Sequence, residues 1–470
     1  MNTQCKRQYT SVMIVPTGVG AAIGGYAGDA LPVARALASV VDCLITHPNV
    51  LNAAMLYWPM QNVLYVEGYA LDRFAEGSWA LQPVHQNRAS GVWVASVTSL
   101  QHDNVGLVLD AGMEKELRIR HLQVADAARA SLGLPVMEYV VTDTPLVVEK
   151  WIDLTTGQST GRIRHPASLL RAVQTLINRS KVNAVAVVGR FPDDDVEEAD
   201  NYRQGMGVDT LAGVEAIISH LVVKEFQIPC AHAPALSPTP LCTSLSPKSA
   251  AEEIGVGRAI KLFVSCSAFI SHFKQEVVFC GLHPVQLGFT FLPCVLSGLS
   301  NAPQYLSKNF DSLGKDCLLA NDVDSVIVPI NACGGDGTLA FARSKQYKPL
   351  IIAVEENDTV LSDSPESLGI EAVCIGKLLQ RFIFFTFLVV ADETVRVANY
   401  WEAIVHLLMA KQFQVPLKDS TEDHAKNAFK SFKISAIVRY LDLGYGRLNS
   451  PTKVGYIYST PTYQSPTTSK

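Results

Sequence analysis

Short hydrophobic runs alternate with longer amphipathic segments along most of the chain. The hydrophobic runs predict strands at residues 12–15, 44–46, 64–66, 105–109, 138–141, 182–188, 326–328 and 350–354. The amphipathic segments predict helices at residues 30–41, 114–132, 167–177, 210–221 and 339–343, with Asp29 as the N-cap of the first. Solid hydrophobic strands separated by helices are typical of a parallel sheet covered on both faces. We therefore expect an α/β fold with a mostly parallel, doubly wound sheet.

We expect this fold to form two lobes followed by a tail. An N-terminal α/β lobe, residues 1–150, contains a glycine-rich loop, and a C-terminal α/β lobe, residues 151–410, contains the pentapeptide GGDGT. Residues 411–470 lose the alternation and end in YSTPTYQSPTTSK, a composition that predicts a poorly structured tail.

Three irregular segments interrupt the alternating pattern: 89–104, 256–288 and 374–395. They lack a consistent period and are rich in Phe, Cys, Ser and Val. One interpretation is that they are ordinary hairpin or lid insertions. The other is that at least the second and third are translated non-coding sequence, which has this bias. Without a period they cannot bury one face consistently, so we expect the second and third to be removable.

Composition narrows the class of protein. Of the 470 residues, 48% are hydrophobic and 18% charged, which indicates a globular chain. A net charge of -5 without a basic stripe argues against nucleic acid as a partner. The ten cysteines show no CxxC pair, so we expect free thiols. The longest hydrophobic window, 382–391, is about half a membrane span, so we expect a soluble protein with no membrane partner.

The most informative stretch is Gly334–Thr338, which reads GGDGT between a strand and a helix. Glycine lets backbone approach a ligand closely, and a helix N-terminus offers free N–H groups to an anion. The candidate ligand-binding residues here are Gly334, Gly335, Gly337 and Thr338. Asp336 is the candidate base, and Cys333 is a candidate nucleophile because a helix N-terminus would lower the pKa of its thiol. A tight turn that binds nothing is the alternative.

A second glycine-rich loop follows the first predicted strand. Its candidate ligand-binding residues are Thr17, Gly18, Gly20 and Gly24. The glycine spacing is GxGxxxG, and about 15 residues separate the strand from the next helix, too many for a dinucleotide-binding turn. The loop therefore either faces another ligand or is a structural Ω-loop.

Charged residues follow the predicted strand at 182–188. Asp193, Asp194 and Asp195 leave its carboxyl end, where ligands of α/β proteins bind, and clustered carboxylates beside a phosphate suit Mg²⁺. Arg190 could pair with the phosphate or balance these acids. A solvated acidic loop is the alternative.

Other polar groups have chemistry but no diagnostic spacing. His47, His220 and His232 lie near element ends, where each could be an acid, a base or a ligand, or a structural group. Cys230 and Cys294 are candidate nucleophiles or buried thiols.

Several long blocks resemble a known family. MIVPTGVGAAIGGYAGDALPVARAL, HPNVLNAAMLYWP, YVEGYALDRFAEG, GRFPDDD, GVEAIISHLVVKEFQIPCAHAPALSP and NACGGDGTLAFAR are similar to an uncharacterised cyanobacterial and plant-plastid family, a domain of unknown function. The resemblance covers roughly residues 11–401 and implies a plastid setting without an assigned activity. The first predicted strand begins too close to Met1 for a transit peptide, so a cytoplasmic location is the alternative. Joining Arg88 to Val105, Gly255 to Thr290 and Val373 to Arg396 gives a sequence that resembles the family without interruption.

The GGDGT pentapeptide also resembles the motif of NAD kinases and diacylglycerol kinases. That resemblance implies that its glycines hold phosphate and that Asp336 is a base or metal partner. The Asn-Glu block and PTGSTAY-like loop of those kinases are absent from the sequence.

Together these features predict a metabolic enzyme that binds a small phosphorylated or nucleotide-like molecule, with phosphoryl transfer as the most concrete reaction. We expect the segments Thr17–Gly28, Asp193–Asp195 and Gly334–Thr338 to converge on one sheet edge. The alternatives are a non-catalytic sensor or assembly factor, and an inactive product of a defective gene model.

Overall fold

The computed structural model describes residues 8–47, 51, 60–83, 104–134, 136–193, 196–237, 246–249, 291–300, 302–307, 317–370, 373–374, 394–397 and 404. The chain divides into two compact units, Met1–Gln412 and Phe413–Lys470, and all described residues belong to the first. The expected irregular segment 256–288 and the tail 411–470 lie outside the described residues. Only the ends of 89–104 and 374–395 are described.

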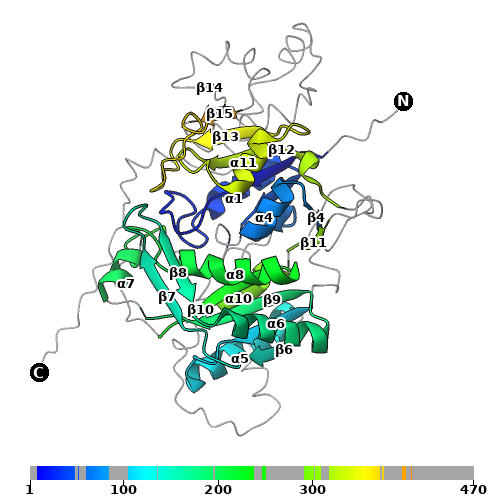
Figure 1. Cartoon of the computed structure of the whole chain (residues 1–470), viewed down its shortest axis with the longest axis vertical. Helices are drawn as coiled ribbons and strands as arrows, with labels where there is room; N and C mark the ends of the chain where they lie inside the picture. Colours follow the sequence, from blue (N-terminus) through cyan, green and yellow to red (C-terminus); the bar gives the residue numbers. More distant parts are fainter. Residues whose placement is uncertain are drawn as a thin grey trace, which may run out of the picture. The chain divides into compact units, whose positions relative to one another are not determined.

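A seven-stranded sheet, sheet A, has the order β14-β15-β13-β12-β1-β2-β3. Its strands are β1 (Thr10–Met13), β2 (Cys43–Thr46), β3 (Val63–Tyr65), β12 (Val323–Pro329), β13 (Leu350–Val354), β14 (Val373–Cys374) and β15 (Thr394–Val397). Every pairing is parallel, as the sequence predicts. Segments from both ends of the described chain meet where β1 pairs with β12 (Figure 1). Sheet A therefore combines strands from both sides of residue 150.

Sheet A is covered on both faces because successive strand residues point to opposite sides. On β1, Val12 belongs to one hydrophobic cluster and Met13 to another. Helix α1 (Leu31–Val40) packs in the cluster of Met13. Helices α4 (Gly68–Ala75) and α11 (Asp336–Arg343) pack in the cluster of Val12. The fold is doubly wound, as expected.

A second sheet has the order β10-β9-β5-β6 and is also parallel. It comprises β5 (Val105–Leu109), β6 (Val136–Val141), β9 (Ala184–Arg190) and β10 (Cys230–Ala235). Its helices are α5 (Lys115–Leu132), α6 (Pro166–Ser180), α8 (Ala212–Phe226) and α10 (Leu292–Leu299), and α7 (Val196–Arg203) precedes α8. Residues of α5 and α10 pack on one face and those of α6 and α8 on the other.

Two antiparallel pairs complete the described elements, together with a 3₁₀ turn, Ala320–Asp322. Strands β7 (Val148–Ile152) and β8 (Ser159–Ile163) form a hairpin. Strands β4 (Trp79–Gln82) and β11 (Gln304–Ser307) pair where the chain leaves sheet A for the second sheet and where it returns. The second sheet is therefore an insertion into the sheet A lobe.

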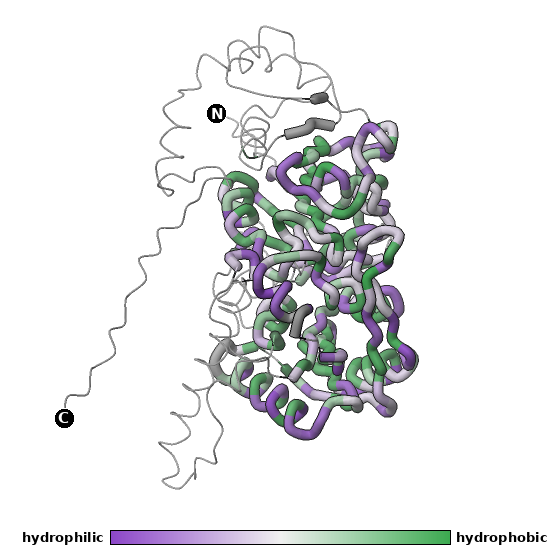
Figure 2. Tube along the Cα trace, turned by 90° about the vertical axis from the view of Figure 1, so that its left-hand side faces the viewer, coloured by the Kyte–Doolittle hydropathy of each residue, from purple (hydrophilic) through white to green (hydrophobic). Residues whose placement is uncertain are grey.

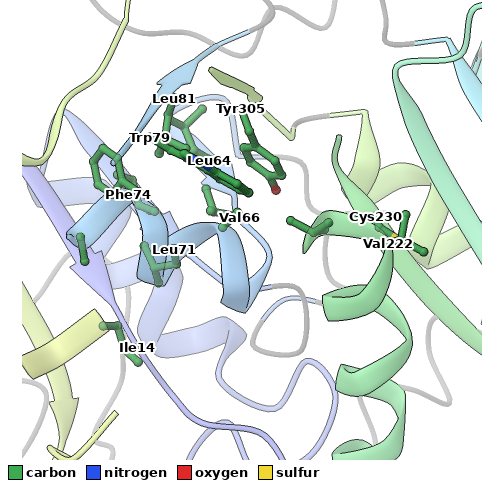
Figure 3. Close-up of a cluster of buried hydrophobic side chains, with 14 of the residues drawn as sticks. Ile14, Leu64, Val66, Leu71, Phe74, Trp79, Leu81, Val222, Cys230 and Tyr305 are labelled. Carbon is green, nitrogen blue, oxygen red and sulfur yellow. The ribbon is translucent and has the colours of Figure 1, made fainter. Parts of the chain in front are cut away.

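One hydrophobic cluster joins the two sheets. It contains side chains of α4 and of α8, and Figure 3 draws Leu71, Phe74 and Trp79 with Tyr305, Val222 and Cys230 in the same cluster. The rings of Trp79 and Tyr305 are stacked, with 5.9 Å between their centroids. Each large side chain buried in this way stabilises the fold by about 2 kcal/mol. Helices α4 and α8 are thus held against each other by hydrophobic contact.

The hydropathy of the described chain follows its layers. Hydrophobic segments lie mainly inside and hydrophilic residues on outer turns (Figure 2). Within the described residues, no helix combines the length and the hydrophobicity needed to cross a bilayer.

Asp29 does not cap α1, contrary to the sequence prediction. The N-cap residue is Ala30, and no side chain caps the helix. Oδ1 of Asp29 instead accepts a hydrogen bond from the N–H of Gly24 at 2.6 Å. Because the carboxyl group is buried, the pKa of Asp29 rises to about 7. This aspartate shapes the glycine-rich loop rather than the helix.

Candidate functional site

The strand order of sheet A reverses between β1 and β12. From β1 the chain continues outward to β2 and β3, and from β12 it continues the other way to β13 and β15. In open α/β sheets such a reversal leaves a crevice outside the carboxyl ends of the strands, where ligands bind. The segments that leave this edge carry the glycine-rich loop after β1, His47 after β2, Glu67 after β3 and GGDGT after β12.

Glu67 and His220 form an ion pair at this edge. Glu67 is the N-cap of α4, and its Oε2 accepts a hydrogen bond from the N–H of Ala70 at 3.3 Å. Its Oε1 is in close contact with Nδ1 of His220 on α8. The Glu67 side chain is 4% exposed, whereas that of His220 is 44% exposed.

The charge of Glu67 decides the titration of His220. Burial lowers the pKa of His220, but the Glu67 carboxylate, helped by Asp72, outweighs burial and the pKa rises above its usual value. A carboxylate at Nδ1 favours the tautomer with its hydrogen there, which leaves the Nε2 lone pair to accept a proton. A buried carboxylate behind a partly exposed imidazole is an arrangement suited to general acid–base chemistry.

Gly68 keeps the free side of the His220 ring uncrowded. A Cβ at this position would lie 3.1 Å from Cε1 and 3.6 Å from Nε2 of His220. The first of these distances is tighter than ordinary contacts between a Cβ and a neighbouring atom. On the same helix, the ring of Tyr69 lies 6.5 Å from that of His220, centroid to centroid.

Asp72 connects α4 with the GGDGT segment. Its Oδ1 accepts a hydrogen bond from the N–H of Gly337 at 2.9 Å. Burial raises the pKa of Asp72 to about 6, against the opposing effect of that hydrogen bond, and the charges of Asp336 and Glu67 add to the rise. A carboxyl group that titrates near neutral pH beside a histidine with a raised pKa forms a pair that can exchange a proton.

The three histidines named by the sequence are neighbours in the fold. The positive charge of His220 adds to burial in lowering the pKa of His47 to about 4 and that of His232 to about 3. Nδ1 of His232 bonds Oγ of Ser219 at 2.5 Å, and its Nε2 lies 3.7 Å from Oε2 of Glu215. Nε2 of His47 is buried, and within the described part of the chain it has no hydrogen-bond partner. His220 is therefore the member of the trio whose pKa is raised, whereas the other two have lowered pKa values.

The GGDGT segment is only partly open. Gly335 and Asp336 are exposed. A Cβ on Gly334 would lie 2.3 Å from Oδ2 of Asp363, and Gly337 already donates its N–H to Asp72. Thr338 is 1% exposed, and no described residue hydrogen-bonds to its hydroxyl. Phosphate binding by this segment stays a prediction, with one of its N–H groups occupied by a carboxylate of the protein.

The candidate cysteines are buried. Cys333 is fully buried, and its thiol donates to the carbonyls of Pro329 and Ile330 at 3.7 Å each. Cys230 and Cys294 are also buried, and burial raises the pKa of Cys230. All three are free thiols, as the scattered spacing predicts.

The glycine-rich loop packs against other parts of the protein. The carbonyl of Gly18 accepts a hydrogen bond from the N–H of Ser159 on β8, and a Cβ on Gly18 would lie 2.6 Å from Oγ of Ser159. A Cβ on Gly20 would lie 3.0 Å from the side chain of Val208, and a Cβ on Gly24 would lie 2.8 Å from that of Val15. Thr17 is half-buried. This packing is that of a structural loop, and a ligand role for it stays a prediction.

Arg190 and Asp193 belong to the second sheet, so the expected convergence of three segments is wrong for Asp193. Arg190 ends β9 and bonds the carboxylates of Asp193 and Glu114. The hydrogen bond from Arg190 lowers the pKa of Asp193 to about 2, and both carboxylates raise the pKa of Arg190. Asp194 and Asp195 lie outside the described residues. Within the described residues, no group of three Asp, Glu, His or Cys side chains is arranged to hold a metal ion.

Sequence reasoning did not single out Glu67 and Asp72. Glu67 directly follows the predicted strand at 64–66, the position where side chains of α/β proteins meet ligands. That position was the available signal for Glu67. The contact with His220 joins distant parts of the chain, and neither local pattern nor spacing indicates it.

Comparisons with known proteins place the chain in a family. The family model described as "Protein of unknown function (DUF3326)" matches residues 10–267 and 282–418. The gap between the matches, residues 268–281, falls inside the irregular segment 256–288. An uncharacterized lipoprotein of Synechococcus sp. is 51% identical over 366 residues, which cover 77% of this chain and 86% of that protein. No solved structure matches the chain.

Proposed function

Because this chain belongs to the DUF3326 family of proteins of unknown function, its chemistry has to be inferred from its site. We propose that it is an enzyme that transfers protons on a small molecule at the carboxyl edge of sheet A. His220 acts as the base and Asp72 as the acid. The observation that carries this proposal is the buried Glu67 carboxylate against Nδ1 of the partly exposed His220.

The titration of the two groups supports their roles. A general base has to be unprotonated and a general acid protonated when the substrate reacts. Catalysis is most efficient when the pKa values of both groups lie near the working pH. Asp72 has a pKa of about 6, and His220 titrates above its ordinary value. The higher pKa makes His220 the stronger proton acceptor of the pair, and the lower pKa makes Asp72 the stronger donor.

The substrate we propose is a small phosphorylated or nucleotide-like molecule. The support is the exposed Gly335 and Asp336 at the start of α11, beside Asp72, and the resemblance of GGDGT to phosphate-binding kinase motifs. Phosphoryl transfer fits this site if His220 or Asp336 takes the proton of the accepting hydroxyl. Anion binding competes with the Asp72 carboxylate for the N–H of Gly337, so phosphate should bind more tightly below about pH 6, where Asp72 is neutral.

The proposed location is a plastid, by the family resemblance. The relative's description as a lipoprotein is a statement about that cyanobacterial protein.

The test of the proposed activity compares the protein with three variants in an extract of small metabolites followed by mass spectrometry. We expect the protein to consume at least one compound, and His220→Asn to slow that consumption by roughly 10²–10⁴-fold, the usual worth of a general base. Glu67→Gln should slow it less. His165→Asn is the control, because His165 is the N-cap residue of α6 on the second sheet. Consumption that is unchanged in His220→Asn would contradict the proposal.

A further inference from the structure

The ring of His47 has an unsatisfied polar atom. His47 directly follows β2, at the carboxyl edge of sheet A. Its Nε2 is buried and has no hydrogen-bond partner among the residues that the structure describes. A buried polar atom without a partner costs stability, so such an atom beside an acid–base pair calls for an explanation.

In each of the other two histidines of the trio, at least one ring nitrogen faces a side chain of the protein. Nδ1 of His220 faces Glu67, and His232 bonds Ser219 through Nδ1 while its Nε2 faces Glu215. A histidine with a purely structural role would be satisfied in the way His232 is. His47 therefore has a different role from His232, although burial keeps both rings uncharged.

Because the His47 ring is neutral, its charge limits which ligand groups it can hydrogen-bond. Burial and the charge of His220 keep the pKa of His47 near 4, so the ring is neutral at physiological pH. A neutral imidazole nitrogen either donates to or accepts from one polar atom, and it adds no charge to the site. Its natural partner is an uncharged carbonyl or hydroxyl oxygen of a ligand, not a phosphate oxygen.

We propose that His47 is a substrate-binding residue whose Nε2 bonds a carbonyl or hydroxyl oxygen of the substrate, next to the group whose proton His220 takes. The substrate then has two neighbouring polar atoms, as in a hydroxycarbonyl compound. Any phosphate that it carries lies away from His47, toward the start of α11. This inference rests on the proposed function, since it assigns the substrate's position relative to His220.

The probe for this inference is acetohydroxamate, a small planar molecule with a carbonyl oxygen beside a hydroxyl. Titration calorimetry at pH 7 measures its binding to the protein, to His47→Leu and to His47→Gln. We expect saturable binding to the protein, weakening of at least tenfold in His47→Leu, and a smaller loss in His47→Gln, whose amide keeps a polar atom. His232→Gln is the matched control, with a buried histidine whose nitrogens serve the protein.

Thermal unfolding distinguishes a variant that has lost the binding contact from one that no longer folds. Thermal unfolding should show His47→Leu as stable as the protein or more so, because the change removes an unpaired buried atom. His232→Leu should be less stable, because it leaves Ser219 without its partner. Equal acetohydroxamate binding by the protein and His47→Leu, or no saturable binding by the protein, would overturn the inference. A loss of stability in His47→Leu comparable to that in His232→Leu would also overturn it. The metabolite experiment with His220→Asn decides the proposed function separately.

Discussion

Oε1 of Glu67, at the edge of sheet A, contacts Nδ1 of His220, on a helix of the second sheet. The exposed histidine is thus oriented by a carboxylate that belongs to a different lobe. The hydrophobic cluster shared by α4 and α8 fixes the distance between the two groups. This ion pair therefore forms only when the inserted sheet is docked on sheet A.

Replacing Glu67 by Gln should lower the pKa of His220. The carboxylate is the largest influence that raises this pKa, so its removal leaves burial to dominate and the pKa should fall. Proton NMR of the histidine Cε1–H signals between pH 5 and 9 measures the change. Glu76→Gln is the control, because Glu76 pairs with Arg73 on the exposed side of the same helix.

The same variant should change how stability depends on pH. A histidine whose pKa is raised by folding stabilises the fold fully below its unfolded pKa, about 6.5. That contribution disappears as the pH rises through the folded pKa. Glu67→Gln should therefore lose more stability at pH 5.5 than at pH 9. An equal loss at both values would show that Glu67 acts through its cap of α4 alone.

Asp72→Asn should make the protein more stable at pH 8 and less active. The carboxyl group titrates at about 6 in the fold and 3.8 unfolded, so its ionisation costs the folded state about 3 kcal/mol at most above pH 6. That cost appears as the pH rises from about 4 to 6 and is absent below. Asparagine avoids it and still accepts the hydrogen bond from Gly337.

Guanidinium unfolding at pH 4 and pH 8 measures this difference. Asp336→Asn is the matched control, since Asp336 is exposed in the first turn of α11, where a negative charge favours the helix. It should bring no gain in stability at pH 8. If Asp72→Asn stabilises the protein no more at pH 8 than at pH 4, the pKa of Asp72 is not raised in the fold.

The strands that the sequence predicts well are those with uniform hydrophobic side chains. Residues 105–109 and 350–354 coincide with β5 and β13. Strand β10 (CAHAPA) has small residues, a histidine and a proline, so its pattern is weak although nearly all of it is buried. Helix α4 begins with a glycine, and the sequence pattern did not predict it. The helix face that carries Asp72 was therefore not predicted either.

From the sequence, the position of the site at the carboxyl edge of the sheet was predictable, but its side-chain contacts were not. A parallel sheet fixes where the segments after β1 and β12 lie, and both are at the carboxyl edge of sheet A. Which helix of the second sheet faces that edge depends on tertiary packing. The pairing of Glu67 with His220 follows from that packing, so spacing alone could not supply it.

Gly68→Ala should reduce access to His220 without unfolding the protein. The added Cβ would lie 3.1 Å from Cε1 of the ring, while alanine favours the helix that begins here. We expect slower modification of His220 by diethylpyrocarbonate, by several-fold, and stability within about 1 kcal/mol of the parent. Peptide mapping measures the modification of each histidine.

Gly335→Ala is the control for this change. Gly335 is the N-cap residue of α11, and an added Cβ there meets no atom within 4 Å. It should leave the modification of His220 unchanged. If Gly68→Ala leaves it unchanged as well, the glycine has no part in exposing the ring.

Gly18→Ala should destabilise the protein strongly. Gly18 has a φ of 70°, and a Cβ there would lie 2.6 Å from Oγ of Ser159 and 3.2 Å from the backbone nitrogen of Gly213. Backbone strain and crowding together should cost about 2–4 kcal/mol. Gly207→Ala has a similar φ of 78° and meets nothing within 4 Å, so it should cost about 1 kcal/mol. Denaturant unfolding of both variants compares the costs, and equal costs would contradict the packing role of Gly18.

Deleting residues 374–395 should preserve the fold, because the strands at its two ends are in register. Strand β14 pairs with β15 so that Val373 lies opposite Val395, and β15 pairs with β13 so that Val395 lies opposite Ile352. Joining Val373 to Arg396 moves Val373 sideways by one strand spacing, about 4.8 Å. It then takes the place of another valine beside β13.

The register also supplies the control for this deletion. Removing one residue more, 374–396, shifts Val373 by one residue in its register along β13. We expect the shorter deletion to keep or raise the melting temperature and the longer one to lower it. If 374–395 is an integral part of the fold, its removal should instead lower the melting temperature by more than a few degrees. The sheet order explains why the first outcome is expected: β14 lies beside β15 at the outer edge, so Val373 can replace Val395 beside β13 while Arg396 and Val397 keep their register.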